Sequence, residues 1–349
     1  MTDWNRRNVL YALGAGAAEL ALASSAWAAP ASTLSIKPIA GSWFEFQHHA
    51  TVEGVDWNPA CVRFTAEQWQ AKVKEIAETG MEYLVLMATA VYYRAFFDTK
   101  IYPRWNLACA DPLEAVLTAA DQCNVKFFIG GGFYGDWLSS KTISDPVAMR
   151  QRLQALDEIA GRYGHHTSFH GWYWPDEAFI NPYYSSEFIA YVNMLSHRAR
   201  QLKPKAQIMI APYGTRNALP DDAYVKQLDD MDVDIVAYQD EVGVQKSRVT
   251  ETSAFYERLR KAHDRSQKAR LWADIELFRF EGEVYNSALL PAPFERILQQ
   301  MQAVSPWVDT ILGYQYLGLM NRPDSVAFAG SAASTRLYED YVGWTRTRR

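Results

Sequence analysis

Acidic side chains recur directly after short apolar runs of this sequence, where their spacing could support acid–base chemistry. Carboxylates crowded into a dry cleft repel one another, so their pKa values separate and one can stay protonated while another is ionised. Such a set supplies the acid and the base or nucleophile that cleavage of a glycosidic bond needs. The residues concerned are Asp176, Glu177, Asp240, Asp274 and Glu276.

Further polar and aromatic residues stand in or beside the same apolar runs. Aromatic rings suit the apolar faces of sugar rings, and no Lys or Arg falls in the run ends that carry the acidic residues. We expect these positions, together with two of the acidic residues above, to contact a substrate. The expected substrate-binding residues are Glu45, Asp176, Asp274, Gln239, Trp174, Tyr213 and Tyr316.

The elements that must position these residues form a regular alternation. Eight apolar, β-type runs are each followed by a helical pattern, and no change of composition divides the series. Near-continuous apolar strands separated by helices are typical of a parallel sheet covered on both faces. The expected strands cover 39–47, 82–88, 125–131, 168–174, 207–212, 233–238, 271–275 and 310–314. The expected helices cover 66–79, 146–163, 185–202, 253–267 and 293–304, with others beginning near 111, after 220 and near 333.

Eight strand–helix units in about 320 residues predict an α/β protein with a single (β/α)8 barrel domain. A doubly wound open sheet is the alternative, but no Gly-rich phosphate loop follows the first run. In barrels of this kind, the active site lies at the C-terminal ends of the strands. The acidic residues at the run ends should therefore meet at one rim.

Residues 1–28 have the pattern of an export signal. Arg6 and Arg7 precede a stretch rich in Ala, Leu and Gly that ends in Ala26-Trp27-Ala28, which fits a twin-arginine signal with a small-x-small cleavage site. No other stretch approaches the roughly 20 apolar residues of a membrane span. We expect a mature barrel over 29–349, without a membrane span, in the periplasm or the medium.

Composition narrows the partners of the chain. The 349 residues carry a net charge of −5 and no basic run suited to a phosphate backbone, so nucleic acid is not an expected partner. The expected partner is a carbohydrate substrate, bound by a monomer. Of the three cysteines, Cys61 and Cys109 fall in successive connecting segments and could form a disulfide, and Cys123 fits a buried thiol.

Histidines offer a second kind of chemistry. His48 and His49 follow the first expected strand and could bind substrate or a metal, whereas His165 and His166 precede the fourth strand and are expected to be structural. His170, inside the fourth strand, fits a core histidine. Because the cysteines match no metal motif, we expect neither a metal nor another cofactor.

The sequence resembles two groups of proteins. Broadly, it is similar to the clan of retaining barrel glycosidases, which by resemblance makes Glu177 the acid/base and Glu276 the nucleophile. The clan commonly has Asn where this chain has Asp176. More narrowly, the segments WYWPDE, AYQDEVG and WADIELF resemble a bacterial family of domains of unknown function described as barrel glycosyl hydrolases. That resemblance covers most of the mature chain and implies the fold and a sugar substrate.

The hypothesis is a glycoside hydrolase acting on a poly- or oligosaccharide. Glu177 would protonate the leaving oxygen. Glu276, or Asp240 if Glu276 is structural, would attack the anomeric carbon or activate a water, while Asp176 and Asp274 would orient and tune these groups. Two alternatives remain. One is a sugar isomerase or epimerase that uses a divalent metal held by clustered Asp, Glu and His, and the other is a barrel that binds glycans without cutting them.

Overall fold

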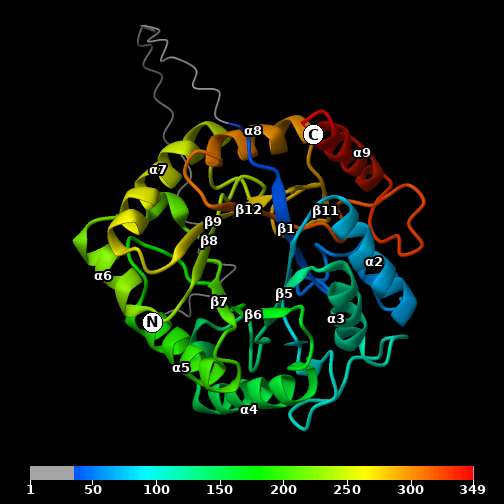
Figure 1. Ribbon diagram of the computed structural model, residues 1–349, viewed down its shortest axis with the longest axis horizontal. Coiled ribbons are helices and arrows are strands. Elements are labelled where there is room, and N and C mark those ends of the chain that lie inside the picture. Colours follow the sequence, from blue (N-terminus) through cyan, green and yellow to red (C-terminus); the bar gives the residue numbers. More distant parts are fainter. Residues whose placement is uncertain (1–34, 349) are drawn as a thin grey trace, which may run out of the picture.

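The computed structural model describes residues 35–348, so the predicted export signal over 1–28 lies outside the described residues and stays a prediction. Eight parallel strands close into a barrel in the order β1-β12-β9-β8-β7-β6-β5-β2, which confirms the predicted (β/α)8 fold (Figure 1). The strands are β1 (Ile39–Phe44), β2 (Tyr83–Leu86), β5 (Lys126–Gly130), β6 (Phe169–Trp174), β7 (Gln207–Ile210), β8 (Ile235–Gln239), β9 (Arg270–Glu276) and β12 (Thr310–Tyr314).

The helices form a ring around the barrel (Figure 1). Their starts follow local capping chemistry: the Asp111 side chain accepts a hydrogen bond from the backbone of Glu114, and Pro112 occupies the first helical position. The helices are α1 (Asn58–Cys61), α2 (Ala66–Glu78), α3 (Pro112–Cys123), α4 (Pro146–Tyr163), α5 (Ser186–Leu202), α6 (Asp222–Asp230), α7 (Val249–Ser266), α8 (Phe294–Val304) and α9 (Ala333–Arg346), with short 3-10 turns at Ser140–Ser144 and Thr215–Asn217.

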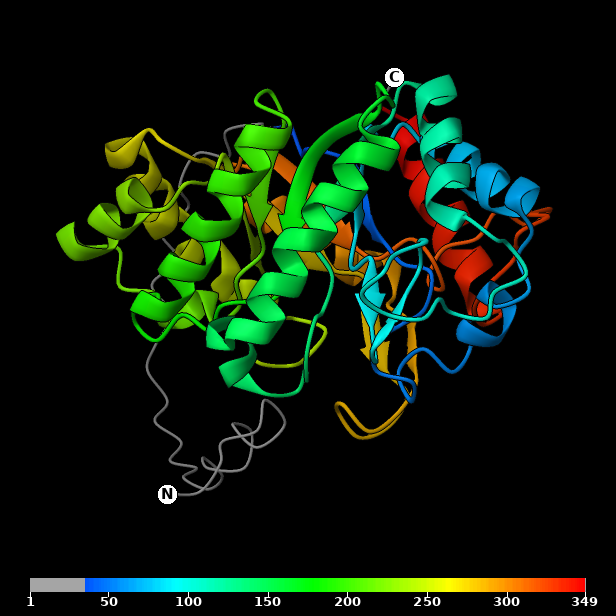
Figure 2. The ribbon, with the colours of Figure 1, turned by 90° about the horizontal axis from the view of Figure 1, so that it is seen from below.

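Two small antiparallel hairpins extend the loops at the C-terminal end of the barrel (Figure 2). The strands β3 (Ala90–Val91) and β4 (Arg94–Ala95) follow β2, and β10 (Phe278–Phe280) and β11 (Leu289–Pro291) follow β9. The backbone N–H of Leu289 donates to the carbonyl of Glu53 at 3.0 Å, which ties the second hairpin to the segment after β1. Neither hairpin was predicted from the sequence.

Large side chains fill the barrel interior in layers. Tyr83, Phe128, His170 and Trp272 contact one another near the N-terminal end of the barrel, in edge-on or tilted pairs. His170 lies in this layer, where burial and nearby cations lower its pKa to about 4, as suits the predicted core histidine. A Cβ atom at Gly171 would meet the Phe128 ring at 2.5 Å, so the close packing at this level depends on a glycine.

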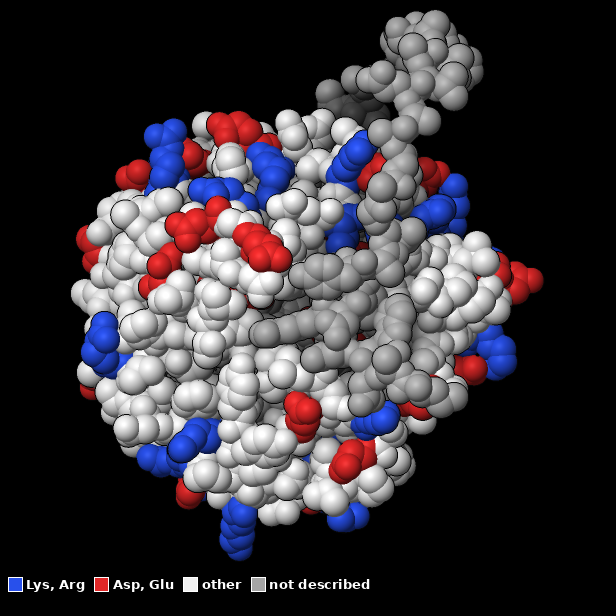
Figure 3. Space-filling model, turned by 180° about the vertical axis from the view of Figure 1, so that it is seen from behind, with Lys and Arg blue, Asp and Glu red and all other residues white. Residues whose placement is uncertain are grey.

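Cys61, Cys109 and Cys123 are all free thiols, so the disulfide considered for Cys61 and Cys109 does not form. Cys123 is only partly buried. Within 35–348, no helix is both long and apolar enough to cross a membrane. Where the described residues are visible on the face turned away from Figure 1, Lys and Arg lie among Asp and Glu (Figure 3).

Candidate active site

A cavity opens at the C-terminal ends of the strands, as the barrel fold predicts. Its walls come from the segments after nearly every strand, and it combines carboxylates with aromatic rings. The polar and aromatic lining residues are His49, Glu53, Phe133, Trp137, Glu177, Tyr213, Gln239, Glu241, Lys246, Asp274, Glu276, Phe278, Phe280, Tyr285 and Tyr314.

Two of the predicted carboxylates reach the cavity from β9. Asp274 and Glu276 are two residues apart on one strand, so their side chains point to the same side, and both are buried. Oε2 of Glu276 accepts a hydrogen bond from the backbone N–H of Val244 at 2.8 Å. Among the described residues, no hydrogen-bond donor reaches Oδ1 of Asp274. β9 therefore presents two different carboxyl groups to the cavity. Glu276 is held by a backbone hydrogen bond, whereas Oδ1 of Asp274 can still accept one.

Asp240, predicted as an alternative catalytic residue, does not line the cavity. Gln239 points inward and lines it, so the next side chain points outward toward the helices. Oδ2 of Asp240 accepts from Nε2 of Gln300 on α8 at 2.6 Å, and Oδ1 accepts from the backbone N–H groups of Val242 and Glu276 at 3.2 Å. Asp240 thus lies directly behind Glu276 and fixes its backbone.

The carboxyl groups of this region cannot all be ionised together. Burial raises the pKa of Asp240 to about 6, and burial followed by the charge of Asp240 raises the pKa of Glu276. The pKa of Asp274 is raised well above its ordinary value by burial and then by Glu276, Asp240 and Glu177. These raised pKa values favour protonated carboxyl groups beside ionised ones, which is the condition for acid and base roles to coexist.

Glu177 and Asp176 are sequence neighbours with different surroundings. Glu177 lines the cavity just beyond β6 and is half-buried. Asp176 is fully buried, and its Oδ2 accepts from Arg152 on α4 at 2.9 Å and from the hydroxyl of Tyr191 on α5 at 3.0 Å. The prediction that Asp176 contacts substrate is therefore wrong, because this carboxylate points into the helix layer.

Two aromatic predictions also fail. Trp174 is fully buried on the outer face of β6, where its Nε1 donates to Ser196 on α5 at 3.2 Å. Tyr316 is buried, and its hydroxyl donates to Glu75 on α2 at 2.8 Å. Neither lines the cavity, because each side chain packs between the barrel and its helices.

Tyr213, by contrast, lines the cavity and belongs to an aromatic wall. Its ring stacks on Phe179 with centroids 5.1 Å apart, and Phe179 is 37% exposed. Nζ of Lys246 lies 5.1 Å from the Tyr213 ring and 5.7 Å from the ring of Tyr285 on the β10–β11 hairpin. Lys246 therefore links two walls of the cavity through cation–π contacts.

Glu241 is buried and joins two loops beside the cavity. Its Oε2 accepts from the backbone N–H groups of Gly214 and Thr215 at 3.0 and 3.1 Å. Lys246 approaches Oε1 at 4.0 Å. Burial raises the pKa of Glu241, and Lys246 opposes this shift. Glu241 joins the loop after β7 to the loop after β8, with one edge on the cavity.

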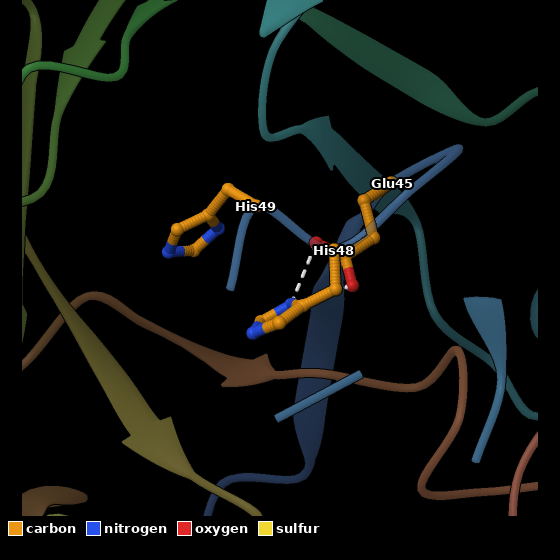
Figure 4. A group of neighbouring side chains, drawn as sticks. All are labelled: Glu45, His48 and His49. Carbon is orange, nitrogen blue, oxygen red and sulfur yellow. Dashed lines mark hydrogen bonds and ion pairs between the residues drawn. The ribbon is translucent and has the colours of Figure 1, made fainter. Parts of the chain in front are cut away.

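Glu45 lies under the cavity wall in a network of its own (Figure 4). Oε1 of Glu45 accepts from Nδ1 of His48 at 2.8 Å, from Trp57 at 2.9 Å and from Gln315 at 2.6 Å. Nε2 of His48 lies 3.2 Å from Oε2 of Glu53. Burial lowers the pKa of His48, but the two carboxylates outweigh it and raise that pKa to about 10. His48 is therefore a cation held between Glu45 and Glu53, and Glu45 does not line the cavity.

Glu45 and His48, together with His49, are also candidate ligands of a metal ion. Glu45, His48 and His49 each place one potential ligand atom within 4.8 Å of the others. However, Oε1 of Glu45 already accepts three hydrogen bonds, and the Nδ1 proton of His48 points at this carboxylate. In Figure 4, the dashed line joins His48 to Glu45. The arrangement is that of a satisfied ion pair and does not fit a metal site.

Several cavity residues were not found from the sequence. Phe133 and Trp137 follow β5, Phe278 and Tyr285 belong to the unpredicted hairpin, and Lys246 stands three residues beyond the AYQDEVG segment. Loop residues carry no periodic signal, so only Tyr314, at the end of an expected strand, had a position that could have revealed it.

The closed parallel barrel, with a carboxylate- and aromatic-lined cavity at the C-terminal ends of its strands, defines a (β/α)8 barrel protein. Residues 39–327 match the family described as domain of unknown function DUF4434, and the chain belongs to that family. This match confirms the predicted resemblance to a family of domains of unknown function. Among curated proteins, none matches the sequence.

Solved structures share the fold at low sequence identity. The structure titled "putative alpha-L-fucosidase" from Bacteroides thetaiotaomicron has a TM-score of 0.70 and 17% identity over 96% of this chain and 99% of that chain. An endo-beta-1,4-mannanase from Thermotoga petrophila has a TM-score of 0.57 and 10% identity over 90% and 78% of the two chains. A beta-galactosidase from Marinomonas ef1 has a TM-score of 0.55 and 11% identity over 82% and 59%. These similarities establish the fold.

Proposed function

We propose that this protein is a glycoside hydrolase whose carboxylates at the ends of β6 and β9 cleave a poly- or oligosaccharide. The observation that carries the proposal is that Glu177, Asp274 and Glu276 line one cavity. Burial and mutual repulsion raise the pKa values of Asp274 and Glu276, which favours protonation of part of the set. The glycosidase-like barrel agrees with this chemistry.

In the proposed reaction, Glu177 donates its proton to the glycosidic oxygen as the bond from that oxygen to the anomeric carbon breaks. In one course the carboxylate of Glu276 bonds to the anomeric carbon, and water then displaces it while giving a proton to Glu177. In the other, Glu276 takes a proton from the water that attacks the anomeric carbon directly. The hydrogen bond from Val244 would hold Glu276 in position, and Asp240 would fix it from behind. Asp274, protonated, would donate a hydrogen bond to a substrate hydroxyl.

The charge of the cavity favours a neutral sugar over an acidic one. Lys246 is the single Lys or Arg among the described lining residues, and it already faces Glu241. A uronic acid or a sulfated sugar would bring a further negative charge into this set, which repulsion opposes. The lining carboxylates are Glu53, Glu177, Glu241, Asp274 and Glu276.

The test compares the wild type with Glu177→Gln and Glu276→Gln on a panel of 4-nitrophenyl glycosides and neutral oligosaccharides. Each substitution should lower kcat/KM by about 10³-fold or more, because it removes a proton donor or a nucleophile while keeping the side-chain shape. Glu281→Gln, an exposed position on the β10–β11 hairpin, is the matched control. Activity that survives in both cavity variants would refute the assignment.

The same panel separates the alternatives. Oligosaccharides that raise the melting temperature without being cleaved by the wild type would favour a barrel that only binds glycans. Loss of activity on dialysis against EDTA, restored by Mg²⁺ or Mn²⁺, would favour metal-dependent sugar chemistry. For a cleaved glycoside, NMR of the first-formed anomer decides between retention, in which Glu276 is the nucleophile, and inversion, in which it activates water.

A further inference from the structure

A second group of metal-ligating side chains lies in the helix layer, apart from the cavity residues. Glu114 on α3 and His165 and His166, just before β6, each place one potential ligand atom within 4.8 Å of the others. We propose that these three residues bind a divalent transition-metal ion such as Zn²⁺. Two imidazoles and one carboxylate suit zinc, and three protein ligands leave room for a water.

The orientation of His166 fits a metal ligand. Its Nδ1 lies 2.6 Å from Oδ2 of Asp121, a carboxylate that also accepts from the backbone of Ser168 at 2.6 Å and the hydroxyl of Thr167 at 3.0 Å. A carboxylate outside the ligand set that receives the Nδ1 proton leaves the Nε2 lone pair for a metal. Nε2 points to Oε2 of Glu114.

His165 is oriented in the same way by a different acceptor. Its Nδ1 lies 3.1 Å from the backbone carbonyl oxygen of Arg162, which can only accept, so Nδ1 carries the proton. Nε2 is therefore the ring atom that can offer a lone pair to a metal. The two rings lie side by side, with centroids 4.2 Å apart and planes inclined by 35°.

The spacing of the ligand atoms agrees with one shared ion. Nε2 of His166 and Oε2 of Glu114 are 3.2 Å apart, and two tetrahedral ligands at zinc distances of 2.0–2.1 Å would be about 3.3 Å apart. Oε1 of Glu114 bonds Thr118 instead, which leaves Oε2 for the ion. His165 is exposed and Glu114 partly exposed, so the group can be reached from solvent.

This site would join α3 to the segment that begins β6. Asp121 and Glu114 lie seven residues apart on one face of α3, and His166 spans the distance between them. An ion bound only by the folded protein stabilises it, and at about 100 times the dissociation constant the melting temperature should rise by about 3 °C.

The experiment titrates Zn²⁺ into full-length protein that carries no polyhistidine tag, followed by calorimetry and by thermal melting. One equivalent should bind to the wild type, and Mg²⁺ should not compete. His165→Ala and Glu114→Gln should each weaken zinc binding at least tenfold. His197→Ala, an exposed histidine on α5, should leave it unchanged.

His165→Ala is the decisive variant. The alternative is that His166 is only an imidazolium bridging Asp121 and Glu114. In that case His165→Ala should leave zinc binding unchanged, because the His165 ring bonds neither carboxylate. Zinc binding that persists in both His165→Ala and Glu114→Gln overturns the proposal. So does binding that is lost only in His49→Ala, which would place the ion at the cavity, and so does the absence of any binding to the wild type.

Discussion

The guanidinium of Arg152 on α4 donates a hydrogen bond to Oδ2 of Asp176 at 2.9 Å, and both side chains are buried. This ion pair, joined by Tyr191 on α5, locks the start of the loop after β6 against two helices. The adjacent Glu177 is thereby presented to the cavity. We predicted from the sequence that Asp176 contacts substrate. Its carboxylate instead holds the neighbouring residue, Glu177, in place.

Asp176→Asn should therefore destabilise the fold. It leaves the Arg152 guanidinium buried opposite a neutral amide, and loss of one partner of a buried ion pair costs about 3–5 kcal/mol. The midpoint of urea unfolding at pH 7 should fall markedly in Asp176→Asn, whereas Glu177→Gln should leave it nearly unchanged. Equal midpoints for the two variants would contradict the structural role of Asp176.

The eight-fold alternation of strands and helices was predictable because each buried strand and each amphipathic helix leaves its own pattern. The facing of side chains was predictable within straight strands: Asp274 and Glu276 share a side of β9 and both reach the cavity. The facing of side chains was predicted wrongly at β6, because the pairing of β6 with β5 shifts register between Phe127 and Phe128. There Trp174 faces the helices.

Beyond the strand ends, alternation no longer applies, and this is where the remaining site predictions failed. Asp176 and Tyr316 lie two residues beyond the ends of β6 and β12, so no period assigns them to a side. Tyr285 and Trp137 enter the cavity from loops whose course is set by tertiary contacts, such as the one between Leu289 and Glu53. A single sequence carries no signal for such contacts.

Asp274 should make the protein less stable as pH rises. Its pKa is raised in the folded state by burial and by neighbouring carboxylates. Above its ordinary value of 3.8, the unfolded chain therefore binds fewer protons at this group than the folded chain does. Stability contributed by the protonated group is complete below that pH and is lost as pH rises through the folded pKa.

Asp274→Asn keeps the neutral form at every pH, so its melting temperature should fall less between pH 4 and pH 8 than that of the wild type. The measurement is thermal melting across this range, in buffers of constant ionic strength. Glu281→Gln, at an exposed position, should follow the wild type. Parallel curves for Asp274→Asn and wild type would show that Asp274 is not held protonated.

Asp240 should control the pH dependence of the proposed reaction through Glu276. After burial, the charge of Asp240 is the main cause that raises the pKa of Glu276. Asp240→Asn removes this charge, so Glu276 should ionise more readily and the acidic limb of kcat/KM should move about one unit lower. Asp229→Asn, on the exposed face of α6, serves as the control. An unmoved limb would mean that another group governs it.

Phe179 should contribute to binding of extended substrates. Its ring is partly exposed and stacks on Tyr213, so it continues the aromatic wall outward from the cavity. Phe179→Ala should raise KM for a tetrasaccharide about fivefold through the loss of apolar contact area, with kcat little changed. KM for a 4-nitrophenyl monoglycoside, which ends within the cavity, should not change.

Phe328→Ala removes an equally exposed ring in the segment before α9 and should have no effect on either substrate. Equal effects of Phe179→Ala on the long and short substrates would show that this ring acts on the cavity itself and not on an outer sugar.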